Sequence, residues 1–168
     1  MLSKQKANST MNKKTLVFAL AFLATSLVSA QPSSLEPFET WQKKNLNWAG
    51  DPSELAYVSV RCSAIYFVIG TIFAELGRTQ DQKLKGNDLT SRSVRLTFLG
   101  SKIGETVGWD SQRSLQRFEA NTDLYMKIIT LNRVNHNNMF HGFVEGDYQF
   151  CLDFEQIIKA VANQVNDK

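Results

Sequence analysis

Apolar positions follow a helical period over one long segment, and this pattern predicts the centre of the fold. Between Leu55 and Leu76 seven apolar residues trace one face, and further apolar residues cover most of the other faces. The seven are Leu55, Val58, Cys62, Ile65, Ile69, Ile72 and Leu76. A helix that is apolar on most sides is buried on most sides, so residues 52–76 are expected to form a mostly buried central helix.

Both ends of this helix carry local signals. Asp51 can accept hydrogen bonds from the first free amides, Pro52 suits the first helical position, and Glu54 is an acid in the first turn. Gly77 predicts a left-handed stop. The unbroken apolar stretch from Ala64 to Ala74 has eleven residues, fewer than the roughly 20 that cross a bilayer.

Two amphipathic helices are predicted on either side of the central region. The first carries Phe38, Trp41 and Trp48 and is expected to end near Gly50. The last has one apolar stripe and ends in a polar tail. This stripe is Cys151, Phe154, Ile158, Val161 and Val165.

The residues between the central and last helices are less regular. Residues 77–88 are polar and have the strongest loop composition of the chain. Residues 89–108 fit a helix better than a strand, although part of the segment alternates. Gly100, Gly104 and Gly108 lie four apart, which indicates either a glycine-weakened helix end or a close helix crossing.

One more helix is predicted after these glycines. Asp110 or Ser111 can cap it, and it is expected to fray in the polar residues 132–138. Its predicted inner face is Leu115, Phe118, Thr122, Tyr125 and Ile129. The sequence therefore predicts a single all-α domain, a bundle of four to five helices around residues 52–76, with no internal repeat.

The first thirty residues have the pattern of a secretory signal peptide. Residues 11–14 are a short positive segment, residues 15–28 are uncharged and largely apolar, and small residues at 28–30 predict cleavage after Ala30. A membrane anchor is the alternative, but fourteen apolar residues fall short of a bilayer span. We expect a mature domain of residues 31–168, exported to the periplasm or secreted.

Cleavage would change the charge of the protein. The whole chain has a net charge of +3, but residues 1–30 hold four lysines and no acid, so the mature chain would carry about −1. Nucleic-acid binders carry clustered basic residues, and we expect no nucleic acid as a partner. The densest basic pairs, expected on a solvated surface, are Lys83 with Lys85, Arg92 with Arg95, and Arg113 with Arg117.

The two cysteines predict one disulfide. Cys62 lies on the apolar face of the central helix and Cys151 on the stripe of the last helix. In an exported protein an even number of cysteines indicates disulfides, and two cysteines allow a single intramolecular pair. A reactive thiol is the alternative, but a close CxxC motif is missing and the one nearby cation is Arg61.

Arg61 is a charged residue on an otherwise apolar helix, so it needs a partner or an exit to solvent. If Cys62 pairs with Cys151, Arg61 comes near Asp147 or Asp153, and we predict a partly buried ion pair beside the disulfide. Alternatively, Gly146 and Asp147 are the capped start of the last helix and Arg61 extends outward.

Candidate chemistry is sparse. His136, His141, Glu145 and Asp147 form a cluster that could serve a metal-dependent or acid/base hydrolase. The histidines are five apart with no glutamate between them, unlike the HExxH zinc motif, so His136, His141 and Glu145 are weak metal candidates. We expect no cofactor.

Four aromatic residues are candidates for a contact surface. Trp48 lies near the end of the first helix, Trp109 lies in a glycine-bounded turn, and Phe140 and Phe143 precede the last helix. We therefore expect an exported binding or interaction module of the cell envelope, whose partner is another envelope or secreted protein or a small ligand. The alternatives are the hydrolase named above and a structural envelope component.

Overall fold

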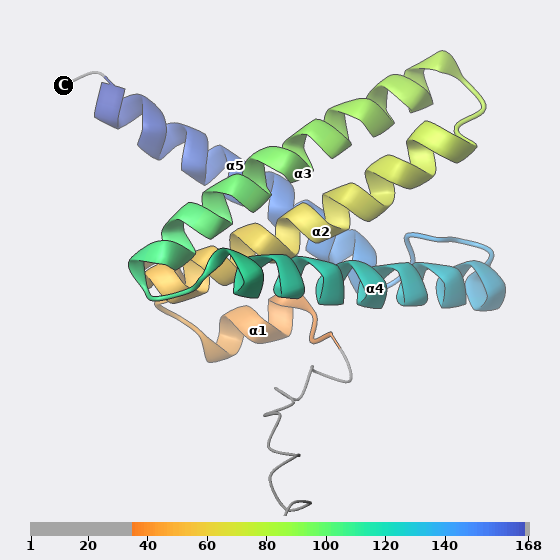
Figure 1. Cartoon of the computed structure of the whole chain (residues 1–168). Coiled ribbons are helices and arrows are strands. Elements are labelled where there is room, and N and C mark those ends of the chain that lie inside the picture. Colours follow the sequence, from red (N-terminus) through yellow and green to blue (C-terminus); the bar gives the residue numbers. More distant parts are fainter. Residues whose placement is uncertain (1–34, 167–168) are drawn as a thin grey trace, which may run out of the picture. The chain divides into compact units, whose positions relative to one another are not determined.

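The computed structural model describes residues 35–166, which form α-helices and one short 3-10 helix. The elements are α1 (Phe38–Lys44), η1 (Trp48–Gly50), α2 (Pro52–Leu76), α3 (Gln80–Thr106), α4 (Ser111–His136) and α5 (Phe143–Asn166). Figure 1 shows α2 and α3 side by side, with α4 crossing them and α5 on the far side of α2. The predicted all-α bundle is confirmed. The predicted signal segment, residues 1–30, lies outside the described residues.

α2 is the buried centre of the bundle, as predicted. It spans Pro52–Leu76, and the Asp51 side chain accepts a hydrogen bond from the Ser53 amide at 2.8 Å. By length and composition α2 could cross a membrane, contrary to our estimate from its unbroken apolar stretch, but most of that window is buried inside the protein. Its apolar surface is therefore explained by packing against the other helices.

The predicted loop over residues 77–88 is wrong, because α3 already begins at Gln80. Thr79 caps the helix: its hydroxyl accepts from the Gln82 amide, and the Gln82 side chain accepts from the Thr79 amide. This reciprocal arrangement is a capping box. The first turns of α3 are polar because they are exposed to solvent, and composition alone does not distinguish an exposed helix from a loop.

Gly77 does not end α2 in the left-handed conformation that we predicted. Its φ is −62° and its ψ is 127°, which any residue can adopt. The glycine is required for space, because a Cβ there would lie 2.3 Å from the carbonyl oxygen of Phe73.

Small residues let α2 and α3 approach closely along their length. A Cβ on Gly86 would lie 2.4 Å from the amide nitrogen of Ala74, and one on Gly70 would lie 2.8 Å from the Thr90 hydroxyl. Near the other end, a Cβ on Gly100 would lie 2.8 Å from Val60. Of the two interpretations of the spaced glycines, the close crossing therefore holds at Gly100.

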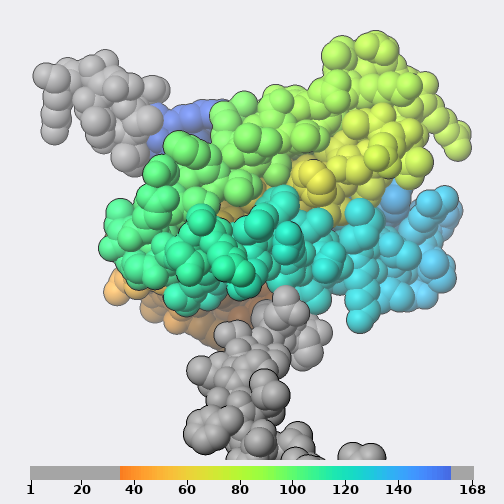
Figure 2. All heavy atoms as spheres, in the orientation of Figure 1, coloured from red at the N-terminus to blue at the C-terminus, as the bar shows by residue number. Residues whose placement is uncertain are grey.

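Of the other two spaced glycines, Gly104 lies in the last turn of α3 and Gly108 lies in the turn into α4. Gly104 packs against the Trp109 ring, and Gly108 has a φ of +80°, which favours glycine. Asp110 caps α4, as expected, by accepting from the Arg113 amide at 2.6 Å. Figure 2 shows the face of the molecule that α3 and α4 cover. On this face α2 is visible mainly in the strip between α3 and α4 and near the α2–α3 turn.

Two details of the helices around α2 differ from prediction. Leu115 is 51% exposed and does not belong to the inner face of α4, which is formed by Ser114, Asn121, Tyr125 and Ile129. The first helix is interrupted, because α1 ends at Lys44 and the 3-10 turn η1 follows. Val161 and Val165 of the predicted α5 stripe lie outside the residues whose side chains are described.

Candidate functional site

The predicted disulfide is confirmed and joins α2 to α5. Cys62 and Cys151 are bonded, with their Cα atoms 5.4 Å apart, and both residues are fully buried. The described part of the chain contains no free cysteine. The bond therefore fixes α5 against the central helix.

Arg61 and Asp147 form an ion pair beside this disulfide. The Arg61 side chain is 0% exposed and the Asp147 side chain 1%, and the Arg61 Nη2 donates to Asp147 Oδ2. Of the two predicted partners, the structure thus brings Asp147 to Arg61. Asp153 is exposed and accepts a hydrogen bond from Gln149 at 3.2 Å.

The alternative, in which Gly146 and Asp147 form the start of the last helix, is wrong, because α5 begins at Phe143 and Asp147 lies in its second turn. Its side chain points away from its own helix. Asp147 Oδ1 accepts from the Phe38 amide at 2.7 Å, which satisfies one of the free donors at the start of α1. Asp147 therefore ties α1 as well as α2 to α5.

Two tyrosines complete the polar network around Arg61. Arg61 Nε donates to the Tyr125 hydroxyl at 3.0 Å, and Nη1 donates to the Tyr57 hydroxyl at 3.2 Å. The Tyr125 hydroxyl in turn donates to Asp147 Oδ2. The guanidinium also lies 3.8 Å from the centroid of the Phe38 ring, a cation-π geometry.

Folding raises the pKa of two members of this network, Arg61 and Tyr125. Burial lowers the pKa of Arg61, but the contacts with Tyr125, Asp147 and Tyr57 outweigh it, and the net pKa is raised. Burial raises the pKa of Tyr125 well above its usual value; Arg61 opposes this and Asp147 adds to it. Arg61 is therefore a cation and Tyr125 a neutral donor at neutral pH.

Sequence reasoning missed the tyrosines. Tyr57 lies four residues before Arg61 on the same helix, a spacing that places two side chains on one face. That signal was available in the sequence. Tyr125 comes from α4, and its contact with Arg61 depends on how the helices cross.

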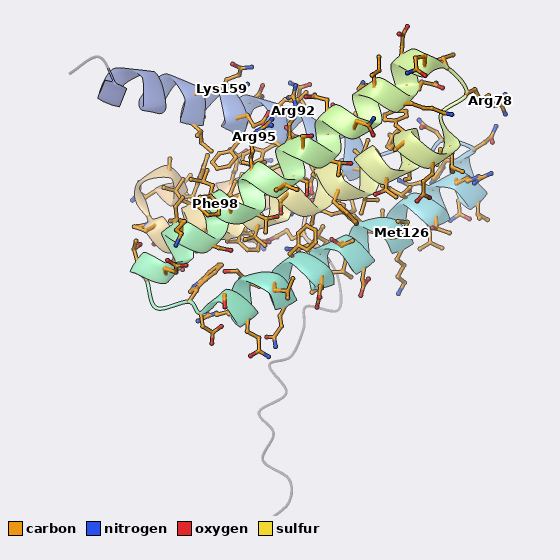
Figure 3. The ribbon with its side chains drawn as sticks, turned by 45° about the horizontal axis from the view of Figure 1, so that its top comes forward. Arg78, Arg92, Arg95, Phe98, Met126 and Lys159 are labelled. Atoms are coloured by element: carbon orange, nitrogen blue, oxygen red, sulfur yellow. A yellow bond between two sulfur atoms is a disulfide. The ribbon has the colours of Figure 1, made fainter. Side chains whose placement is uncertain are left out.

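A second polar cluster joins α3 to α5. Arg92 donates to Asp88 on its own helix at 2.8 Å and to Glu155 of α5 at 2.9 Å. Figure 3 shows Arg92 on the side of α3 that faces α5. The nearby Tyr66 is fully buried, and its hydroxyl has no hydrogen-bond partner among the described residues. Burial and then Glu155 raise the pKa of Tyr66.

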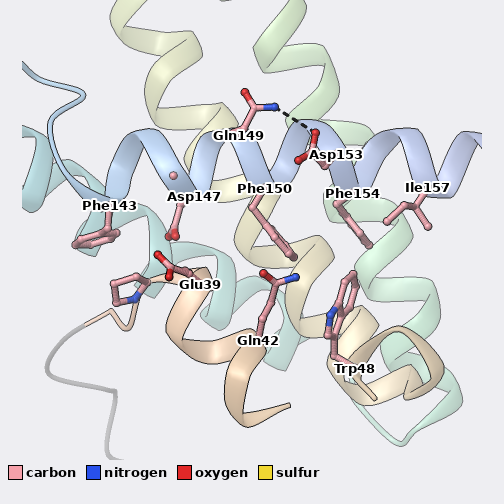
Figure 4. A pocket seen from close by; sticks show the side chains of 12 residues that line it. Glu39, Gln42, Trp48, Phe143, Asp147, Gln149, Phe150, Asp153, Phe154 and Ile157 are labelled. Atoms are coloured by element: carbon pink, nitrogen blue, oxygen red, sulfur yellow. Dashed lines mark hydrogen bonds between the residues drawn. The ribbon is translucent and has the colours of Figure 1, made fainter. Parts of the chain in front are cut away.

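An open groove lies between α1 and α5. One part has a volume of about 420 Å³, and its walls include Glu39 and Gln42 from α1 and Phe150 from α5. In Figure 4, Phe150, Phe154 and Ile157 project from α5 toward Gln42 and Trp48. We call this feature, together with its extension described next, the α1–α5 groove.

The groove continues past Trp48 into an apolar second part. This part has a volume of about 340 Å³ and shares Trp48, Phe154 and Ile157 with the first. Its other walls are Ala49, Leu55, Leu99, Ile103 and Ile158. None of the residues that line either part is a lysine or an arginine.

The four predicted contact aromatics are separated by the fold. Trp48 and Phe143 are half-buried and line the α1–α5 groove. Phe140 is half-buried and lines a different hollow of about 300 Å³ between α2 and α5. Trp109 is 5% exposed and borders a smaller cavity rather than an open contact surface.

The histidine cluster does not form a ligand set. The rings of His136 and His141 lie 4.1 Å apart between centroids, at the end of α4 and in the loop after it. His141 and Glu145 do not share a helix, because α5 begins at Phe143. Among the described residues, no three His, Cys, Asp or Glu side chains are grouped as a metal site requires.

One of the basic pairs expected on a solvated surface is packed on an aromatic ring. Arg113 lies 5.2 Å and Arg117 4.5 Å from the centroid of the Trp109 ring. Burial lowers the pKa of Arg117, and the charge of Arg113 lowers it further. Arg117 is therefore a half-buried cation beside a second cation.

Comparison with known proteins gives no relative. No protein-family model, no curated protein and no solved structure matches the chain.

Proposed function

We propose that this protein is an exported binding module of the cell envelope, which holds a basic, amphipathic segment of a partner protein in the α1–α5 groove. The observation that carries the proposal is the floor of this groove. Trp48, Phe154 and Ile157 belong to both of its parts, so one apolar surface continues through them. Ile157 is 50% exposed and Trp48 is half-buried, whereas Phe154 is 1% exposed, so Ile157 and Trp48 provide the accessible part of this surface. Accessible apolar surface in a groove is typical of an interaction site.

The length of the groove favours a polypeptide. Phe143 and Ile157 both line it and lie fourteen residues apart on α5. At 1.5 Å per residue, the α5 wall is about 21 Å long, enough for about six residues of extended chain. A long open groove suits a chain segment better than a compact small molecule.

The charge of the groove favours a basic segment. Asp153 contributes a carboxylate that has no cation within 4.0 Å among the described residues, and Gln42 and Gln149 contribute amides. Glu39 contributes a second carboxylate, which forms an exposed ion pair with Lys43 at 2.8 Å. A basic partner can compete for this carboxylate, because exposed ion pairs are weak. Asp147 also borders the groove, but Arg61 already neutralises it. Since no lysine or arginine lines the walls, a partner that alternates apolar and basic residues has the complementary pattern.

The proposed location rests on two features. The sequence of residues 1–30 has the pattern of a signal peptide, and the disulfide requires an oxidising compartment to form and persist. If the chain is expressed in a bacterium with a periplasm, N-terminal sequencing of the exported protein should begin at Gln31. Full-length protein in the cytoplasmic fraction with reduced cysteines would contradict export.

A peptide-binding experiment tests the groove. The exported protein is titrated against fluorescent 14-residue peptides of alternating Leu and Lys, or of alternating Leu and Glu, and anisotropy is measured. We expect the Leu-Lys peptide to bind and the Leu-Glu peptide to bind at least tenfold more weakly. Equal affinity for both peptides, or no binding of either, would overturn the proposed charge preference and the proposed partner.

Matched variants locate the binding. Ile157 is 50% exposed in the groove, and Val134 is 76% exposed on α4, where it lines neither part of the groove. We expect Ile157→Ser to weaken Leu-Lys binding about tenfold, which corresponds to ~1.4 kcal/mol, and Val134→Ser to leave it unchanged. If both variants bind alike, the peptide does not occupy the groove.

A further inference from the structure

A smaller cavity lies where α1, α2 and the α3–α4 turn meet, and it has a different chemical character. Its volume is about 240 Å³, and none of its lining residues lines the α1–α5 groove. The residues that line it are Trp41, Ser53, Glu54, Tyr57, Trp109 and Arg117. It thus combines three aromatic walls with one guanidinium.

Arg117 brings to this cavity a cation that has no ion pair, although the charge of Glu54 raises its pKa from a greater distance. Among the described residues, neither Arg117 nor Arg113 has a carboxylate oxygen within 4.0 Å of its guanidinium. Both guanidinium groups lie over the Trp109 ring, so two positive charges are held near each other. An anion bound at Arg117 would relieve their repulsion, and a half-buried guanidinium binds carboxylate more strongly than an exposed one.

The Tyr57 hydroxyl adds a hydrogen-bond donor whose orientation is fixed by Arg61. Its hydroxyl oxygen accepts from the buried Arg61 at 3.2 Å, so the hydroxyl hydrogen is directed away from Arg61. Among the described residues this hydrogen has no acceptor, and Tyr57 lines the cavity. The positive charge of Arg61 also makes the hydroxyl a better donor to an anion.

The remaining walls limit which anion fits. Trp41 and Trp109 are 8% and 5% exposed, so each presents only a small part of its indole ring to the cavity. Glu54 is the single carboxylate in the lining. Doubling the charge of an anion doubles its attraction to Arg117 as well as its repulsion from Glu54, so charge alone does not favour a carboxylate over phosphate. The aromatic residues in the lining favour an organic anion, because inorganic phosphate has no apolar group to contact them.

We propose that this cavity is a binding site for a small organic carboxylate that carries a planar apolar group. Arg117 and the Tyr57 hydroxyl bind the carboxylate, and the planar group lies against Trp41 and Trp109. The site is separate from the α1–α5 groove, so it does not depend on the peptide partner proposed above.

Three small probes test the ligand class. The exported protein is titrated with benzoate, with the neutral isostere benzamide and with inorganic phosphate, and the indole N–H signals are followed by two-dimensional NMR. We expect benzoate to give a saturable shift at the Trp41 and Trp109 signals. We expect benzamide and phosphate to bind at least tenfold more weakly. The proposal is overturned if benzamide or phosphate matches benzoate, or if benzoate gives no saturable shift at these two signals.

Variants test the assigned residues. We expect Arg117→Gln to weaken benzoate binding at least tenfold, and Arg133→Gln, at an exposed arginine of the same helix, to have no effect. Tyr57→Phe should weaken binding severalfold, and Glu54→Gln should strengthen it, because the repelling carboxylate is removed. The Glu54 variant remains informative if Arg117→Gln does not fold. Undiminished binding in Arg117→Gln, or weaker binding in Glu54→Gln, would refute the assignment.

Discussion

Replacing Asp147 with asparagine is the sharpest test of how this fold is held together. The variant keeps the shape of the side chain and an oxygen that can accept from the Phe38 amide. It removes the charge opposite Arg61, whose side chain is 0% exposed, and the acceptor used by the Tyr125 hydroxyl. The guanidinium is then a buried cation with no counter-ion.

The expected cost follows from that burial. Removing one partner of a buried ion pair costs about 3–5 kcal/mol, and because the Phe38 contact survives we expect a value near ~3 kcal/mol. Domains of this size are stable by only about 5–15 kcal/mol. With a urea dependence of about 1–3 kcal/mol per molar, the midpoint should fall by about 1–3 M.

The assay is urea unfolding of the oxidised protein at pH 7, followed by circular dichroism. Asp153→Asn is the matched control, because Asp153 lies on the same helix, is exposed and contacts Gln149 rather than a cation. We expect the control to leave the midpoint unchanged. If Asp147→Asn shifts the midpoint no more than Asp153→Asn, the buried pair does not stabilise the fold and the reasoning is refuted.

A double variant separates the cost of a buried charge from the value of the pair. In Arg61→Met with Asp147→Leu, no uncompensated charge remains in the core. Buried ion pairs replaced by apolar residues are often close to neutral in stability. We therefore expect the double variant to be more stable than either single variant, and a loss equal to the sum of the two single losses would contradict this.

Three further predictions concern the disulfide, the helix contact and alkaline pH. Cys62→Ala with Cys151→Ala should lower the free energy of unfolding by about 2–4 kcal/mol in urea, because the bond closes a long loop, and an unchanged midpoint would contradict this. Gly86→Ala should lower the melting temperature, because its Cβ would lie 2.4 Å from a backbone nitrogen of α2, whereas Gly146→Ala, with nothing within 4 Å, should raise it slightly. Folding raises the pKa of Tyr125 above 10.0, so its stabilising contribution is present below pH 10 and is lost as pH rises further. The NMR signals of the Tyr125 ring should therefore report its ionisation together with unfolding, and ionisation in the folded protein near pH 10 would contradict this.

The sequence predicted those parts of the fold that depend on local signals. The bounds of α2 follow from a cap at Asp51 and a continuous apolar period, and both act within a few residues. The start of α3 was predicted wrongly, although Thr79 and Gln82 have the capping-box spacing. The polar composition of residues 77–88 was taken as a loop signal that outweighed the cap. A cap next to a polar segment should therefore count as a helix signal.

The polar network was only partly predictable. Asp147 was within reach because the disulfide fixes α5 against α2, and its spacing from Cys151 then places it near Arg61. Tyr125 needed the crossing of α4, which no spacing in the sequence encodes. The groove and the smaller cavity could not be predicted from the sequence for the same reason, since each is lined by residues from several helices.

Arg61 lies between the two proposed binding sites, and this position has a consequence for both. Its partner Asp147 borders the α1–α5 groove, and its partner Tyr57 lines the smaller cavity. Because both partners are held by a fully buried side chain, neither is free to reorient when a ligand arrives, so each site is formed before binding. Asp147→Asn should therefore weaken benzoate binding as well as stability, because an unpaired Arg61 no longer holds Tyr57 in place, whereas Asp153→Asn should leave benzoate binding unchanged. Equal benzoate affinity in the folded Asp147→Asn protein and the wild type would show that Arg61 supports the fold without ordering the cavity.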